Sequence, residues 1–351
     1  MKKFSYIEVL RLFTALSVVL YHYIHFFSPF SSISNFKIME NKFSLPFFSF
    51  LEFIYDNGRY GVEMFWTISG FVFAFVYLNK SNKISSKDFF INRFCRLYPL
   101  HLLTLLIVAF LQIISMKLNG SFQIYNGNDF YHFIINLFFV NGWGFSKIPS
   151  FNNVTWSVSI ELIIYFIFFI SIIYLNKFNF KFIICVYIIL LFLDKNFEID
   201  NFYKIAFFDC CRLFFSGILV YYLYIKVDKK FYLYMFSTIL ICASFIGSLK
   251  IFILFPSIVL FLALLGTPNN LKLRSFLQAN GDLTYALYLL HIPTQILIIL
   301  IIGYFNISYE IFLNKYFFIF YIFLLIFISH LSFKFFENPL NYGLRRKLKN
   351  E

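Results

Sequence analysis

The segment DLTYALYLLHIPTQILIILIIG, residues 282–303, decides the fold class. A bilayer core about 30 Å thick is crossed by about 20 predominantly apolar helical residues. This segment is long enough, and its charged residue, Asp282, stands at its start, so it predicts a membrane-spanning helix. The 351 residues are 60% hydrophobic and only 13% charged, whereas soluble chains carry about 25% charged residues. This composition excludes a soluble enzyme, a disordered chain and a nucleic-acid-binding protein.

The same length criterion finds further spans along the chain. Clear candidates are residues 6–27, 60–78, 97–116, 154–175, 203–225, 282–303 and 315–336, and shorter ones are 180–194, 231–247 and 251–265. The mean hydropathy of +0.76 agrees with so many apolar runs. We therefore predict an all-α polytopic membrane protein with about ten transmembrane helices. No repeat or linker divides the chain, so we expect a single domain over residues 1–351.

The positions of the basic residues predict the orientation of these helices. If the short apolar segment 131–140 does not cross the membrane, most of the 30 Lys and Arg residues fall on one side, which is typical of the cytoplasmic side. If it did cross, the basic clusters at 226–230 and 345–349 would be external. We therefore expect both termini in the cytoplasm and segment 131–140 to be re-entrant or interfacial. The loops 28–59 and 117–153 are then external.

Ionisable side chains inside a span cost at least a few kcal/mol, so each one is a candidate functional residue. They include Glu8, Arg11, His22, His25, Glu161, Asp209, Arg212 and His291. The pairs Glu8–Arg11 and Asp209–Arg212 are spaced three apart, so each is either a structural ion pair or part of a site. His25 is typical of a residue at the membrane interface. His291, a single histidine within its span, is typical of a residue that forms a hydrogen bond between helices.

His22 and Glu161 differ from these because no opposite charge lies near them in the sequence. Each therefore needs a partner from another helix. Near the external face, a neutral imidazole and a carboxylate can act together as a general base on a hydroxyl. Arg11 lies about 16 Å below His22 on nearly the same face of the first helix.

Two arginines, Arg93 and Arg96, precede the span at 97–116 and lie in the predicted cytoplasmic loop 79–96. Basic residues at this position usually set topology and contact lipid headgroups. Their spacing of three also suits a bidentate clamp on phosphate, which lysine does not match. Both interpretations remain open from spacing alone.

Six segments, in this order, resemble the acyltransferase-3 family of integral membrane acyltransferases. They are Tyr6–His22, with Glu8, Arg11 and His22; Gly61–Phe71, with Glu63; Phe89–Leu100, with Arg93 and Arg96; Val154–Tyr165, with Trp156, Ser157 and Glu161; Gly281–Pro293, with Tyr285 and His291; and Ser329–Pro339. The resemblance extends from residue 5 to about residue 345. Leu162 follows Glu161 where many relatives have a second acidic residue, so only Glu161 inherits a role.

The resemblance implies transfer of an acyl group, most often acetyl, from cytoplasmic acyl-coenzyme A to a hydroxyl of a cell-envelope glycan. O-antigen of lipopolysaccharide, capsule and other lipid-linked saccharides all fit as acceptors, and the location implied is the inner membrane. Catalysis is expected from His22 and Glu161, and donor binding from Arg11, Arg93 and Arg96, without a metal. Supporting roles are expected for Glu8, Glu63, Trp156, Ser157, Arg212, Tyr285 and His291.

Two other functions remain as alternatives. A transporter or flippase would use the buried charges as an ion relay, but the sequence has no inverted repeat of the kind common in such folds. A membrane-embedded sensor or scaffold would need neither His22 nor the pair Arg93 and Arg96. Assays of acylated product and point substitutions distinguish all three.

Overall fold

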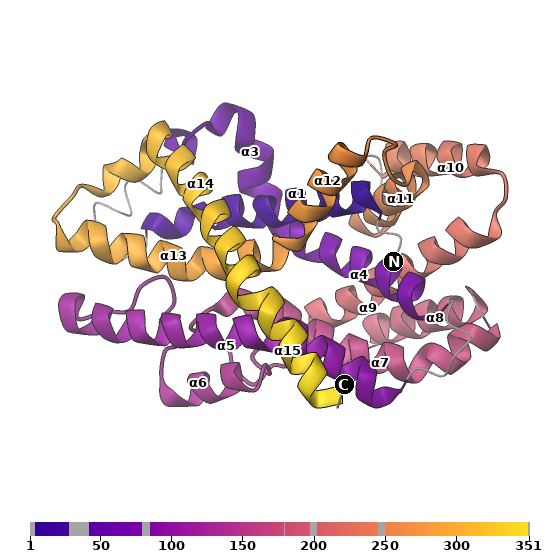
Figure 1. The fold of residues 1–351 in the computed structure, drawn as a ribbon, viewed down its shortest axis with the longest axis horizontal. Coiled ribbons are helices and arrows are strands. Elements are labelled where there is room, and N and C mark those ends of the chain that lie inside the picture. The colour runs from indigo at the N-terminus through magenta and orange to yellow at the C-terminus, as the bar shows by residue number, and fades with distance from the viewer. Residues whose placement is uncertain are drawn as a thin grey trace. The chain divides into compact units, whose positions relative to one another are not determined.

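The computed structural model describes residues 4–27, 42–78, 85–178, 180–196, 202–244 and 250–349. Within these ranges all regular structure is helical, which confirms the predicted all-α class (Figure 1). The chain forms two compact units, each built from three separate stretches. The first unit comprises Met1–Thr14, Tyr60–Ser86 and Ser157–Asp282, and the second comprises Ala15–Arg59, Lys87–Trp156 and Leu283–Glu351. Each unit is described by itself.

Seven helical segments among the described residues are long and apolar enough to cross a membrane. They are Ser5–Phe27, Phe48–Tyr77, Ser86–Asn119, Asn153–Phe178, Phe202–Lys226, Thr284–Tyr304 and Lys315–Lys349. Three shorter apolar helices, Phe180–Leu190, Lys230–Ala243 and Ile251–Leu265, coincide with the three shorter candidates from the sequence. The chain is therefore a polytopic membrane protein. The side of the membrane that each helix end faces stays a prediction.

The first unit contains the start of α1 (Ser5–Tyr21) and seven further helices. These are α4 (Gly61–Tyr77), α7 (Trp156–Phe178), α8 (Phe180–Asn196), α9 (Phe202–Lys226), α10 (Lys230–Ala243), α11 (Lys250–Leu265) and α12 (Leu271–Asp282). Helices α4 and α9 pack backbone against backbone, because a Cβ atom on Gly70 would overlap the carbonyl of Phe214 and one on Gly217 would overlap that of Thr67. Small residues allow this approach between helices in lipid.

The second unit contains the end of α1 and the remaining elements. These are η1 (His22–Phe27), η2 (Lys42–Ser44), α3 (Phe48–Asn57), η3 (Gly58–Tyr60), α5 (Ser86–Asn119), α6 (Phe130–Leu137), η4 (Asn153–Thr155), α13 (Thr284–Tyr304), η5 (Tyr309–Leu313), α14 (Lys315–Ser332), the π-helix η6 (Phe333–Glu337) and α15 (Asn338–Lys349).

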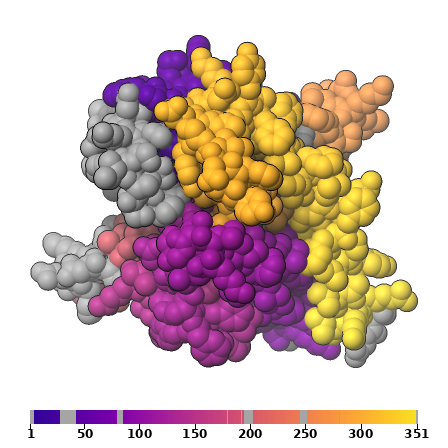
Figure 2. Space-filling model, turned by 90° about the vertical axis from the view of Figure 1, so that its left-hand side faces the viewer, coloured from indigo at the N-terminus to yellow at the C-terminus, as the bar shows by residue number. Residues whose placement is uncertain are grey.

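Helix α13 lies along α5 in the second unit, and the Tyr285 hydroxyl joins them by donating a 2.7 Å hydrogen bond to the carbonyl of Leu97. Figure 2 shows this packing as surfaces, with the orange surface of α13 and α14 directly against the purple surface of α5. Tyr285, predicted as a supporting residue, thus ties the two helices together.

The structure differs from the predicted boundaries in one functionally important place. Helix α5 is 34 residues long and begins at Ser86, so Arg93 and Arg96 lie in a helix and not in a loop that ends at residue 96. Asp88 in the first turn favours this start through the helix dipole. The first turns of α5 were predicted as a loop because their charged residues are too polar for a membrane span. The helix nevertheless extends beyond the apolar span that the sequence predicts.

The short segment predicted not to cross the membrane forms α6, which has eight residues. A helix of this length extends about 12 Å, less than half of a bilayer core. Three other helices, α3, α12 and α15, were not predicted at all. Their residues are too few or too polar to register as spans.

Candidate active site

His22 stands where α1 changes from an α-helix to the 3₁₀ helix η1. A 3₁₀ helix has three residues per turn, so residues three apart stack above one another. The rings of His22 and His25 accordingly stack with centroids 4.8 Å apart and planes inclined by 18°. On another face, Tyr23 and Phe26 are fully buried, and the Tyr23 hydroxyl donates to the carbonyl of Phe312 at 2.8 Å. This packing fixes η1 and presents the two imidazoles on one side.

The partner that His22 needed from another helix is His291. Nδ1 of His22 lies 3.0 Å from Nε2 of His291 on α13, and the two ring planes differ by 10°. His291 is completely buried. The predicted interhelical hydrogen bond of His291 is therefore made to the predicted catalytic residue itself.

Gln295 is a neighbour of His22 that the sequence analysis did not single out. Its side-chain Nε2 donates to the backbone carbonyl of His22 at 2.9 Å, and the residue is completely buried. An amide inside an otherwise apolar span, four residues after His291, was the available signal, because polar groups in membrane helices usually bond across helices.

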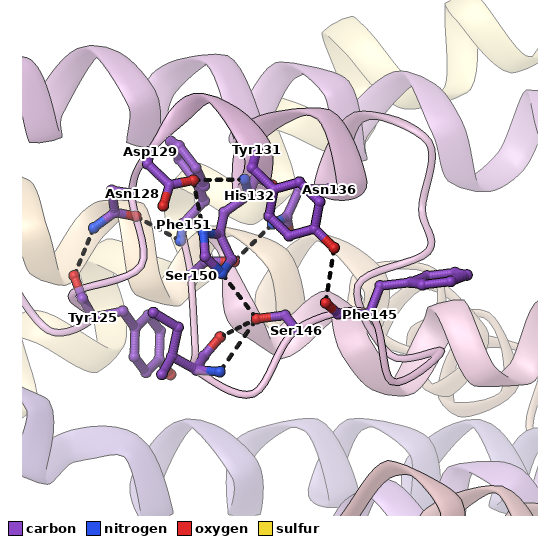
Figure 3. A network of polar contacts seen from close by, with 11 residues as sticks. Tyr125, Asn128, Asp129, Tyr131, His132, Asn136, Phe145, Ser146, Ser150 and Phe151 are labelled. Atoms are coloured by element: carbon purple, nitrogen blue, oxygen red, sulfur yellow. Dashed lines mark hydrogen bonds and ion pairs between the residues drawn. The ribbon is translucent and has the colours of Figure 1, made fainter.

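The loop between α5 and α7, residues 120–155, reaches the same cluster. The Tyr125 ring packs edge-on against His25, with centroids 5.4 Å apart. Asn128 holds this part of the loop: its Nδ2 donates to the carbonyl of Tyr125 at 2.6 Å, and its Oδ1 accepts from the Phe151 N–H at 2.7 Å (Figure 3). The Tyr288 hydroxyl of α13 donates to Val154 at the end of the loop.

Backbone strain is concentrated in this loop. Ile124, Phe139 and Phe151 all have positive φ angles, of 63°, 61° and 46°. Such conformations cost of order 1–3 kcal/mol for residues other than glycine and persist where surrounding contacts enforce them. Figure 3 shows such a contact for Phe151, whose N–H donates to Asn128 Oδ1. The strained loop is therefore held in one shape beside His25.

Asp129, His132 and Ser146 form a chain of hydrogen bonds in the order of a serine hydrolase triad (Figure 3). Nδ1 of His132 lies 2.7 Å from Asp129 Oδ1, and Nε2 lies 3.0 Å from Ser146 Oγ. However, Asp129 is the N-cap of α6, and Ser146 Oγ donates its proton to the Ile148 carbonyl at 2.7 Å. This serine is therefore not poised as a nucleophile, and the chain of bonds holds the loop in shape.

Arg93 and Arg96 lie one turn apart on α5, and the closing helix α15 packs beside them. Arg345 donates from Nη2 to the carbonyl of Asn92 at 3.5 Å, and Lys349 forms an ion pair with Asp88 at 3.0 Å. Basic residues of α15 thus gather around the first turns of α5. This concentration of positive charge suits a phosphate-bearing ligand.

In the first unit, Glu8 and Arg11 form the ion pair that their spacing predicted. Arg11 Nη1 lies 3.0 Å from Glu8 Oε2. A Cβ atom on Gly281 of α12 would overlap the Glu8 side chain, so only glycine lets α12 approach at this point. Gly281 therefore helps to fix Glu8, which in turn orients Arg11.

The other charged candidate residues of the first unit, Glu63, Glu161 and Arg212, lie on α4, α7 and α9. Glu161 is buried, with 8% of its surface exposed, and Glu63 stands in the first turn of α4. Arg212 lies 3.8 Å from Asp209, and its guanidinium stacks over the Phe252 ring at 5.4 Å. The Asp209–Arg212 spacing therefore produces a long ion pair that is supported by an aromatic face.

Residues 4–334 match the family described as an acyltransferase domain, which is the acyltransferase-3 family. The chain belongs to this family. Comparison with curated proteins and with solved structures gave no match. The family match runs through both units and ends before α15.

As a member of the acyltransferase-3 family, the chain is a membrane acyltransferase. The predicted site residues of this acyltransferase divide between the units. The second unit holds His22, Arg93, Arg96, Trp156, Tyr285 and His291, and the first holds Glu8, Arg11, Glu63, Ser157, Glu161 and Arg212. The joint action of His22 with Glu161, and of Arg11 with the other two arginines, therefore stays a prediction.

Within the second unit of this acyltransferase, His22 is supported at both its ring and its backbone. The Nδ1 edge of the His22 ring is held by His291, and the His22 backbone carbonyl is held by the side-chain amide of Gln295. Such support sets which ring nitrogen carries the proton. Whether Nε2 of His22 is free to accept a proton therefore depends on which of the two imidazoles donates in this hydrogen bond.

Proposed function

We propose that this protein transfers an acyl group, acetyl in the simplest case, from acyl-coenzyme A in the cytoplasm to a hydroxyl of a cell-envelope glycan. Its location would be the plasma membrane, which is the inner membrane in a cell with two. The hydrogen bond of 3.0 Å between His22 and His291 carries the proposal, because it gives a partly buried imidazole the support that a general base needs.

The proposed reaction balances with these groups alone. Nε2 of His22 takes the proton from the acceptor hydroxyl, whose oxygen attacks the thioester carbonyl carbon. The carbon–sulfur bond breaks, an ester forms on the sugar, and the coenzyme A thiolate takes the proton back from His22. General-base assistance of this kind contributes typically about 10²–10⁴ in rate.

The donor would be held through its phosphates. Arg93 and Arg96 form a pair on α5, and a guanidinium binds phosphate through two parallel hydrogen bonds. Arg11, oriented by Glu8, is proposed as a further contact to the donor. Glu161 is proposed to orient the imidazole or to accept its proton.

The deciding experiment supplies radiolabelled acetyl-coenzyme A to inside-out membrane vesicles and follows label in the glycan fraction. The unaltered protein is expected to label glycan, and His22→Gln to reduce labelling at least about 10²-fold at equal protein level. Mass analysis of envelope polysaccharide should show the loss of one acyl increment in the His22→Gln cells. Unchanged labelling with His22→Gln would remove the base from this mechanism. Transport without ester formation would instead support a transporter.

A further inference from the structure

One face of α13 holds His22 at two points. Nε2 of His291 contacts the His22 ring at 3.0 Å, and Nε2 of Gln295 donates to the His22 carbonyl at 2.9 Å. Residues four apart lie on the same face of a helix, so ring and backbone are held by successive turns of one element. Both His291 and Gln295 are completely buried, so solvent does not reach their side of these bonds.

The bond from Gln295 falls at the junction of two helix types. α1 ends at Tyr21 and η1 begins at His22. A carbonyl oxygen accepts two hydrogen bonds, so Gln295 adds a tertiary bond to whatever bond the helix itself makes there. A 3₁₀ helix has poorer hydrogen-bond geometry than an α-helix, which makes an external support valuable at this residue.

The proton shared by the two imidazoles decides whether His22 can act as a base. If Nδ1 of His22 donates to Nε2 of His291, Nε2 of His22 keeps its lone pair and can accept a proton. If His291 donates instead, Nε2 of His22 carries a proton and is useless as a base. The outcome depends on how the His22 ring meets His291, and therefore on the backbone position that Gln295 sets.

The other rings near His22 do not compete for this role. His25 lies parallel to the His22 ring at a centroid distance of 4.8 Å, and Tyr21 lies at 5.2 Å with planes inclined by 61°. Hydrogen bonds of an imidazole run along its edge, in the ring plane. His25 covers a face of the ring and leaves the Nδ1 edge to His291.

We propose that Gln295 is a positioning residue of the transfer reaction: it anchors the His22 backbone so that the ring donates from Nδ1 to His291 and keeps Nε2 free as the base. This inference rests on the proposed function, in which His22 removes a proton from the acceptor. Neither the family resemblance nor the sequence motifs assign a role to Gln295.

The test compares Gln295→Glu and Gln295→Met with a matched control, Gln112→Glu. Gln112 on α5 is also buried and also donates to a backbone carbonyl at 2.9 Å, that of Gln123, but it does not touch His22. Glutamate keeps the shape of glutamine and lacks its donor only when ionised, whereas methionine keeps the length without any polar atom and removes the donor at every pH. Thermal unfolding in detergent shows that each variant is folded before its kinetics are measured.

A displaced base should lower kcat and leave donor binding intact. We expect both Gln295 variants to lose roughly 10- to 100-fold in kcat, as for a base misplaced by about 1 Å. The KM for acetyl-coenzyme A should change less than about twofold, because no phosphate contact is altered.

The acid limb of the pH–rate profile of both Gln295 variants should shift as well. Titratable neighbours of His22 in this unit are His25, His291 and Tyr21. Gln112→Glu should lose stability without either change.

A second measurement does not depend on turnover. Diethylpyrocarbonate modifies an unprotonated imidazole nitrogen, and peptide mass spectrometry reports modification at His22. We expect slower modification of His22 in both Gln295 variants and an unchanged rate in Gln112→Glu. Normal kcat, pH profile and modification in the Gln295 variants, with His22→Gln inactive, overturn this inference alone. An active His22→Gln overturns the proposed function first.

Discussion

Asn152 donates a hydrogen bond of 2.9 Å to the backbone carbonyl of Leu289, on the helix that carries His291. This carbonyl is available because Pro293, four residues later, has no N–H to donate to it. The α5–α7 loop therefore supplies the donor that the proline removes, and it is fastened to α13 within one turn of His291.

Replacing Asn152 tests this arrangement. Asn152→Ala leaves the buried Leu289 carbonyl unsatisfied and should lower the free energy of unfolding by about 1–3 kcal/mol. Combining it with Pro293→Ala restores a backbone donor, so the double variant should be more stable than the sum of the single effects predicts. Chemical unfolding in micelles gives the double-mutant cycle. Strict additivity would show that the two residues do not share this carbonyl.

Gly281→Ala should act on donor binding from a distance. Its Cβ would overlap the Glu8 carboxylate and displace the residue that orients Arg11. If Arg11 contacts the donor, the KM for acetyl-coenzyme A should rise about tenfold, as expected for loss of one charge-assisted hydrogen bond. Gly303→Ala is the control, because its nearest neighbour, the Tyr309 hydroxyl, lies at 3.8 Å. An unchanged KM in a folded Gly281→Ala protein would separate Arg11 from the donor site.

Gly70→Ala and Gly217→Ala should damage folding rather than chemistry. Each new Cβ would overlap a backbone carbonyl of the facing helix, and neither backbone can move without parting α4 from α9. Overpacking typically costs about 1–3 kcal/mol, so we expect a lower melting temperature and less protein in the membrane. Gly343→Ala meets nothing within 4 Å and should behave as the unaltered chain. Equal melting temperatures for all three variants would contradict the packing described.

Arg93→Lys and Arg96→Lys separate phosphate binding from mere positive charge. Lysine keeps the charge that sets topology but loses the planar pair of donors. We expect normal membrane insertion and a several-fold higher KM for acetyl-coenzyme A in both variants. Lys347→Ala, a change elsewhere in the basic closing helix, is the comparison. If lysine substitutes without effect, the arginines serve topology only.

Lowering the pH should destabilise the α5–α7 loop, because it protonates the Asp129 carboxylate. Hydrogen bonds from the backbone N–H and the ring of His132 hold the pKa of this carboxyl below its ordinary value of 3.8. Because the pKa is lower in the folded state, the stabilisation is complete above pH 3.8 and is lost as pH falls through the lowered value. Hydrogen exchange of loop peptides should accelerate in that range. Asp129→Asn, which has no carboxylate, should abolish this pH dependence of hydrogen exchange. If the pH dependence persists in Asp129→Asn, another titratable group causes it.

Hydropathy predicted the long helices because lipid imposes a minimum apolar length on each of them. It missed the first turns of α5 because the helix extends past the membrane, where polarity no longer marks its end. The same limit hid α12 and α15. Helix formation in water-facing segments depends on packing against neighbours, which one sequence does not display.

His22 was a candidate because of its isolation among apolar residues, and an interhelical hydrogen bond was expected of His291. Their pairing could not be predicted, since residues 269 positions apart meet only through tertiary structure. The change to a 3₁₀ helix at His22 was equally hidden, and with it the stacking on His25. Gln295 could have been recognised as a candidate because it is an amide among aliphatic residues. Its hydrogen-bond acceptor could not be predicted, because a backbone carbonyl is not specified by any sequence motif.

The interleaving of the two units has a practical consequence for chimaeric enzymes. Each unit is assembled from three stretches, and one border falls between Thr14 and Ala15, inside α1. A single crossover between two relatives, anywhere within residues 15–282, would therefore mix foreign and native packing in both units at once. Exchange of specificity between such proteins requires grafting all three stretches of a unit together, with the junction in the first helix placed between Thr14 and Ala15.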